Sequence, residues 1–201
     1  QVEQHQPLLR RPARGRSPGM ATRSMLPPGV DAASLMEDIE ELRALRRTDE
    51  YKDLYRRVQQ DGLALRDAPP EMLGDHELVA EACWSNGMAL QYAPTELQAD
   101  MEIVMCAVSK NGAALLYASE ALRGHREIVL KAVEMDGGSL EYASEELCND
   151  REVVLTAVQK RGMALRYASQ DMKNDPEIVK AAVRQSKLAI KFASNSLKKD
   201  Q

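Results

Sequence analysis

Histidine and cysteine are the side chains of this sequence with the most versatile chemistry, and neither is arranged as a catalytic or metal site. The three histidines show no metal-ligand spacing, either with one another or with a cysteine. The chain also carries no phosphate-binding glycine loop, no nucleophile elbow and no paired catalytic carboxylate motif. We therefore expect no catalytic residues, no cofactor and no bound metal, and a protein that is not an enzyme.

The three cysteines indicate a reducing environment rather than a disulfide framework. They form no close pair, and their number is odd. Cys83 stands at a position that is valine in other copies of a 25-residue repeat, so we expect it in the core. Cys106 and Cys148 stand at positions that are mostly polar, so we expect exposed thiols, although no neighbouring residue suggests activation.

Aromatic side chains recur every 25 residues, and such a column could stack against a ligand. Its members are Tyr92, Tyr117, Tyr142, Tyr167 and Phe192. The other interpretation is that the rings pack between successive copies and direct their hydroxyls to water. We favour the packing interpretation, and the sequence leaves the ligand interpretation open.

Two apolar residues stand at repeat positions that are polar in the other copies. Trp84, the single tryptophan, shares its position with Ser109, Glu134, Gln159 and Arg184, and Leu116 shares its position with Gln91, Glu141, Arg166 and Lys191. Exposed aromatic anchors commonly carry interface energy, so Trp84 and Leu116 are candidates for binding a protein partner. The alternative for Trp84 is packing beneath the N-terminal helices.

A repeat of 25 residues must position all of these side chains. The phrase NGAALLYAS at 111–119 recurs as NGMALQYAP, DGGSLEYAS, RGMALRYAS and SKLAIKFAS, without insertion or deletion. In the copy that begins at Asp100, this aspartate is the expected N-cap of an amphipathic helix and Gly112 its expected end. A shorter second helix follows, and Ser119 is placed to cap one further turn. In a later copy Pro176 follows the cap, where proline is favoured in a first helical turn.

A single pair of short helices cannot bury its apolar face, whereas stacked copies can. We therefore predict an all-α solenoid of stacked short helical hairpins over residues 62–201, with about five to six units. The stacking is expected to be right-handed. At the C-terminal end, Asp200 stands where another helix would be capped, which predicts further repeats in a longer parent chain or a partner that covers this end.

Residues 31–61 are expected to form two helices that cap the array. The first has Asp31 as its candidate N-cap and acids ahead of its basic end, an order that suits the helix dipole. The second has Thr48 as its expected cap and Gly62 as its end. A degenerate copy of the repeat, GLALRDA, comes directly afterwards.

Residues 1–30 are rich in Pro, Gly, Arg and Ser and show no hydrophobic period, so we expect an extended arm without a core. Five arginines and one acid give residues 1–30 a charge of +4. The arginines are the expected contacts to a partner: Arg10, Arg11, Arg14, Arg16 and Arg23. The alternatives are a tail with no role and an organelle transit peptide. No run approaches the roughly 20 apolar residues of a membrane span. We expect an intracellular protein, in a plastid, a mitochondrion or the cytoplasm.

The repeat resembles the helical repeats of domain of unknown function 4116. That family's pattern is an acid-capped D-x-E-I-V-x-x-A-V helix followed by G-x-A-L-x-Y-A-S-x-x-L, and here it covers residues 73–199. The departures from it are Asp67, Pro94, His125 and Lys187. The resemblance implies a helical array without an assigned activity, and it carries over no catalytic or binding residues.

The charge of the chain is divided along its length. Residues 31–150 sum to −14, whereas residues 151–201 sum to +6. An acidic array repels phosphate, which disfavours RNA binding over most of the protein. We expect a non-catalytic scaffold or accessory subunit that makes protein–protein contacts in a larger assembly. The alternative is an RNA-associated helical repeat protein that uses the arm and the basic C-terminal units.

Overall fold

Residues 32–199, the part of the chain that the computed structural model describes, consist of short helices joined by turns, without a strand. Side chains are described from residue 36 to residue 198. The chain divides into two compact units, Gln1–Asp53 and Leu54–Gln201, with the boundary inside the second helix. Helices α1 (Ala32–Arg47) and α2 (Asp49–Gln60) come first.

The N-terminal unit confirms one predicted cap. The amide of Tyr51 donates to the hydroxyl oxygen of Thr48 at 3.2 Å, so Thr48 caps α2 as expected. The expected cap of α1, Asp31, lies outside the described residues. Along α1, Ile39 and Leu45 are half-buried and Leu42 is exposed.

The second unit begins with the remainder of α2 and the degenerate copy of the repeat. This copy contains the 3-10 helix η1 (Gly62–Asp67) and the short helix α3 (Pro70–Leu73). Leu54 and Val58 are buried, and Arg57 forms an ion pair with Asp67 at 2.8 Å. The end of α2 is therefore packed as part of the same unit as the repeats.

From Asp75 onward, 25-residue units follow one another at 75–99, 100–124, 125–149, 150–174 and 175–199. Each opens with a ten-residue α-helix: α4 (His76–Ser85), α6 (Met101–Lys110), α8 (Arg126–Met135), α9 (Arg151–Lys160) and α11 (Pro176–Gln185). A six-residue 3-10 helix comes next: η2 (Gly87–Tyr92), η3 (Gly112–Tyr117), η4 (Gly137–Tyr142), η6 (Gly162–Tyr167) and η7 (Lys187–Phe192). A final short helix closes each unit: α5 (Thr95–Gln98), α7 (Glu120–Arg123), η5 (Leu147–Asn149), α10 (Gln170–Lys173) and α12 (Asn195–Lys199).

The predicted helix starts are confirmed in the 100–124 and 175–199 units. The carboxylate of Asp100 accepts the amide of Ile103 at 2.9 Å, and Ser119 accepts the amide of Leu122 at 3.4 Å. Pro176 occupies the first turn of α11 behind the capping Asp175. These contacts satisfy amides that have no partner inside the helix.

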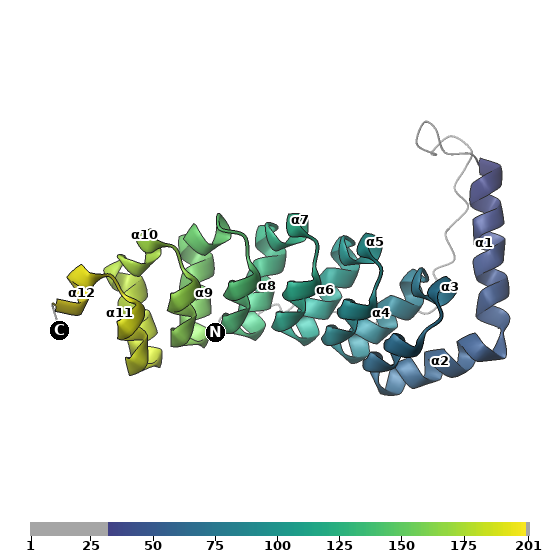
Figure 1. The fold of residues 1–201 in the computed structure, drawn as a ribbon, viewed down its shortest axis with the longest axis horizontal. Coiled ribbons are helices and arrows are strands. Elements are labelled where there is room, and N and C mark those ends of the chain that lie inside the picture. The colour runs from purple at the N-terminus through teal and green to yellow at the C-terminus, as the bar shows by residue number, and fades with distance from the viewer. Residues whose placement is uncertain (1–31, 200–201) are drawn as a thin grey trace, which may run out of the picture. The chain divides into compact units, whose positions relative to one another are not determined.

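Each helix packs on its counterpart in the next unit, so the units follow one another in a row (Figure 1). Ile103, Val104, Ala107 and Val108 are fully buried, and the corresponding residues of α8 and α9 are fully buried as well. The leucines of four successive 3-10 helices are also fully buried: Leu90, Leu115, Leu140 and Leu165. Corresponding residues of successive copies thus share one environment, which is the property of a repeat array.

A main-chain hydrogen bond joins each unit to the one before it at the serine position. The amide of Ser119 donates to the carbonyl of Gln98 at 2.9 Å, and Ser144, Ser169 and Ser194 make the same bond. Pro94 stands at this position in the first unit and has no N–H to donate. Proline is therefore tolerated in the first unit, where this series of main-chain hydrogen bonds has not yet begun.

The glycine that follows α6 has a different role from the predicted one. Helix α6 ends at Lys110, Asn111 caps it, and Gly112 opens η3. A Cβ atom on Gly112 would stand 2.3 Å from the carbonyl oxygen of Ala132 in the next unit. Glycine is needed there because two units approach each other closely, and not because the helix must stop.

Candidate protein-interaction surface

Arginines at the start of the α-helices link neighbouring units. Arg126 donates to Asp150 at 3.0 Å and also pairs with Glu152. Arg151 repeats this arrangement one unit later, with Asp175 at 3.1 Å and Glu177 at 3.6 Å. We call this row of contacts the arginine ladder.

The aspartates of the ladder are held in their ionised form. Partial burial of Asp150 opposes ionisation, but the amide of Val153 and the guanidinium of Arg126 together keep the pKa of this carboxyl below its ordinary value. The pKa of Asp175 is lowered in the same way: burial is outweighed by the amide of Ile178 and by Arg151. One carboxylate thus caps its own helix and binds the preceding unit.

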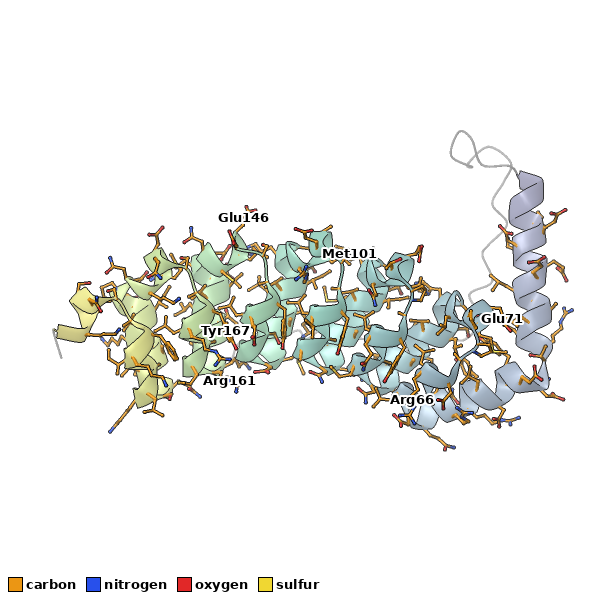
Figure 2. The ribbon with its side chains drawn as sticks, viewed as in Figure 1. Arg66, Glu71, Met101, Glu146, Arg161 and Tyr167 are labelled. Carbon is orange, nitrogen blue, oxygen red and sulfur yellow. The ribbon has the colours of Figure 1, made fainter. Side chains whose placement is uncertain are left out.

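The ladder is interrupted at Met101 and His125. Met101 occupies the arginine position of α6 and is 44% exposed, at the edge of the array where the short helices lie (Figure 2). His125 occupies the capping position of α8 but makes no capping hydrogen bond. Its Nδ1 is buried, with no hydrogen-bond partner within the described part of the chain. An apolar side chain therefore faces solvent where the next two units present an arginine.

Trp84 lies near the C-terminal end of α4, where it is half-buried rather than fully covered. The ammonium of Lys110, from the next α-helix, stands 3.6 Å from the centroid of the indole ring, which is a close cation–π contact. Met135 occupies the position of Lys110 one unit further on and is 48% exposed. Trp84, Lys110 and Met135 thus lie at the C-terminal ends of α4, α6 and α8, the corresponding helices of three consecutive units.

Leu116 is 45% exposed on the 3-10 helix η3. The structure therefore places it among the 3-10 helices, whereas Trp84 belongs to the α-helices. One unit later the same position holds Glu141, which accepts a hydrogen bond from the hydroxyl of Tyr167. Leu116 offers no such acceptor to Tyr142, so it remains an apolar side chain on a polar row.

The tyrosine column is half-buried in each of its members. Tyr167, labelled in Figure 2, has its hydroxyl between Glu141 of the preceding unit and the neighbouring Arg166. The guanidinium carbon of Arg166 also lies 4.3 Å from the centroid of this ring. This arrangement agrees with packing between units, and Tyr167 directs its hydroxyl to a carboxylate rather than to water.

The expectation of exposed thiols at Cys106 and Cys148 is wrong. Both residues are half-buried, and the thiol of Cys148 donates to the carbonyl of Leu140 at 3.5 Å. Burial raises the pKa of Cys106 to about 11, and raises the pKa of the buried Cys83 to about 12. Burial also raises the pKa of Cys148. Thiols of this kind stay protonated at neutral pH and are poor nucleophiles.

Met101 and Met135 are candidate contact residues that the sequence analysis missed. The same comparison of columns that singled out Trp84 and Leu116 would have found them, because their positions are otherwise polar or proline. All four side chains come from the units between residues 75 and 149. We call Trp84, Met101, Leu116 and Met135 the apolar outlier set. The arm arginines, from Arg10 to Arg23, lie outside the described residues.

Within the described residues, no group of three or more His, Cys, Asp and Glu side chains is placed to hold a metal ion. None of the described helices is both long enough and apolar enough to cross a bilayer.

Short helices, a unit of 25 residues and contacts between consecutive units define a helical repeat protein. The family described as Domain of unknown function (DUF4116) matches residues 85–123, 125–173 and 150–198, and the chain belongs to it. This confirms the resemblance seen in the repeat pattern. No curated protein and no solved structure matches the chain.

Proposed function

We propose that this protein is a non-catalytic scaffold or accessory subunit that binds protein partners within a larger intracellular assembly. In this proposal the repeats form a right-handed solenoid, with α1 and α2 as N-terminal capping helices and residues 1–30 as an extended arm. Such an array suits a scaffold because it offers a long continuous surface whose variable positions select the partner. The arm composition is compatible with a plastid or a mitochondrion as well as with the cytoplasm.

The observation that carries the proposal is the apolar outlier set. Isolated apolar side chains on a surface are ordinary. Here, however, four of them interrupt columns that are otherwise polar or proline, and all four come from three consecutive units. Met101, Leu116 and Met135 are each more than two-fifths exposed. Apolar anchors within a polar surround are the usual pattern of a protein interface.

The test replaces three of the four outliers by residues that other units carry at the same positions. Trp84→Gln, Leu116→Glu and Met135→Lys should preserve the fold, because Gln159, Glu141 and Lys160 are accommodated at the corresponding sites. The wild-type chain and the triple variant would be purified from the native source, and co-purifying proteins would be quantified. We expect the amount of each specific co-purifying protein to fall at least about tenfold. A loss of this size corresponds to removal of a binding hot spot worth about 2 kcal/mol.

A matched control changes the repeat positions of Trp84 and Met135 in another unit, with Gln159→Glu and Lys160→Gln. These changes should leave the partners unaltered. A second variant lacks residues 1–30 and tests the arm arginines. If the triple substitution combined with removal of the arm left every interaction intact, the assignment of these surfaces to a partner would be wrong.

RNA association is the second candidate, because the last unit exposes several cations. Arg184, Lys187 and Lys191 are all exposed. Against it, Arg161 lies 3.6 Å from Asp136, so part of the basic charge of the C-terminal units is offset. Binding of single-stranded RNA that weakens steeply with added salt would favour this candidate, and no binding at low salt would exclude it.

A further inference from the structure

The glycine that opens each inner 3-10 helix sets how closely the next unit approaches. A Cβ on Gly137 would stand 2.2 Å from the carbonyl oxygen of Ala157, and one on Gly162 would stand 2.3 Å from that of Ala182. The atoms met are backbone atoms in the last turn of the following α-helix, and they cannot rotate away as a side chain can. An added Cβ atom on Gly62, Gly87 or Gly112 would overlap a backbone carbonyl oxygen of the following unit in the same way. This spacing between units therefore requires glycine.

Lys187 occupies the glycine position in the 175–199 unit. It opens η7 and is exposed. A lysine carries the Cβ that glycine lacks. If another unit stacked here at the spacing of the inner units, its backbone carbonyl would overlap that Cβ atom. Widening the gap would remove the close packing on which the interface depends.

Two further substitutions lie on the side of α11 that would face another unit. This side is identified by Arg126 and Arg151, which reach forward to the following unit. One helical turn later on the same face stand Leu130 and Leu155, both half-buried. In α11 the two positions hold Pro176, which cannot form the ladder contact, and Lys180, which is exposed.

Two apolar side chains of the 175–199 unit are more exposed than their counterparts one unit earlier. Leu188 is 67% exposed, whereas Met163 at the same position one unit earlier is half-buried. Ile190 is half-buried where Leu165 is fully buried. Lys187 comes directly before Leu188 in the chain, at a position where the inner units carry glycine.

We infer that Lys187, together with Lys180 and Pro176, ends the repeat array at the 175–199 unit. A further repeat of this kind does not stack on that unit in register, whatever chain follows. The inference rests on residues inside the unit, and it holds independently of the proposed function. Terminal repeats carry a more polar outer face than inner ones, which keeps the end of an array soluble. Lys180 and Lys187 add charge to a face on which Leu188 stays exposed. The sequence left two possibilities for the C-terminal end, further repeats or a partner that covers it. The inference rejects the stacking of further repeats.

The test adds one further 25-residue unit to the C-terminal end of the chain. A copy of residues 150–174 would replace residues 200–201, in the wild-type background and in a K180L/K187G background. Limited proteolysis would report whether the added unit is folded, and hydrogen exchange would report protection of the segment around Leu188. We expect the added unit to be cleaved at least about tenfold faster in the wild-type background, which keeps Lys187, than in the K180L/K187G background.

The outcome that overturns the inference is an added unit that resists cleavage and protects Leu188 equally in both backgrounds. A second experiment places a lysine inside the array. Gly162→Lys should lower the exchange protection of α11 by about tenfold or more, while α4 and α6 stay protected. Gly74→Lys is the matched control, because a Cβ on Gly74 meets no atom within 4 Å. Full protection of α11 in Gly162→Lys would equally contradict the inference.

Discussion

Arg126 donates a hydrogen bond to the carboxylate of Asp150 at 3.0 Å, from one repeat unit to the next. The other oxygen of the same carboxylate accepts the amides of Glu152 and Val153 at 2.9 and 3.0 Å. Capping of a helix and stacking of two units therefore depend on one ionised side chain. Disturbing this carboxylate should weaken both at once.

Acid should destabilise the array through Asp150 and Asp175. Both have a pKa below the ordinary value in the folded protein, so their contribution is present above the unfolded pKa of about 3.9 and is lost as the pH falls through the folded pKa. Asparagine is an equally good N-cap without a charge. We expect Asp150→Asn to lose less stability than wild type between pH 5 and pH 3, measured by urea unfolding at each pH. Parallel losses in the two proteins would contradict this account.

His125→Asp should stabilise the protein. The substitution gives α8 the cap that α6 and α9 already have, and it removes a buried ring nitrogen that has no hydrogen-bond partner among the described residues. The expected gain is about 1 kcal/mol in the free energy of unfolding. Denaturant unfolding measures it, and Asp100→His serves as the reverse substitution with the opposite sign. A loss of stability in His125→Asp would show that the histidine has another role.

Ser139→Ala should also stabilise the array. The hydroxyl of Ser139 is buried at the contact with Gly112 and has no hydrogen-bond partner within the described region, and the same position is alanine in the neighbouring units. Removing a buried, unpaired hydroxyl should raise the free energy of unfolding by about 1 kcal/mol. The matched control is Ala164→Ser, which should cost about 1–3 kcal/mol. If both variants moved in the same direction, an unpaired hydroxyl could not be the cause.

Gly87→Ala should be strongly destabilising, although alanine is a conservative replacement. Its Cβ would stand 2.2 Å from the carbonyl oxygen of Ala107, so the two units must separate. We expect a loss of roughly 3 kcal/mol in thermal or chemical unfolding. Gly74→Ala is the control: its site is open and its backbone is helical, so it should be neutral or up to about 1 kcal/mol stabilising. Equal effects at the two sites would rule out close approach as the reason for glycine.

Much of the fold could be predicted because its signals repeat locally. Asp100 and Ser119 were recognisable as caps, since a cap acts on amides two or three residues further along the chain. The buried column from Ile103 to Val108 was recognisable from helical spacing within one copy. Trp84 and Leu116 were found by comparing copies, and the structure leaves both partly exposed.

Contacts between units were beyond such reasoning. Gly112 looked like the end of a helix, and only its distance from Ala132 showed why glycine is needed. Cys148 was expected at the surface, but its thiol turns inward to the carbonyl of Leu140. The ladder formed by Arg126 joins residues 24 positions apart, a separation that has no signature in either segment alone.

By itself, the sequence determined that this protein is a helical array with a 25-residue unit, because caps and apolar spacing act within one unit and recur in each copy. The tertiary structure decided how closely the units approach, which side chains bridge them and why the inner 3-10 helices must open with glycine. Those properties depend on distances between chain segments that only the folded array brings together.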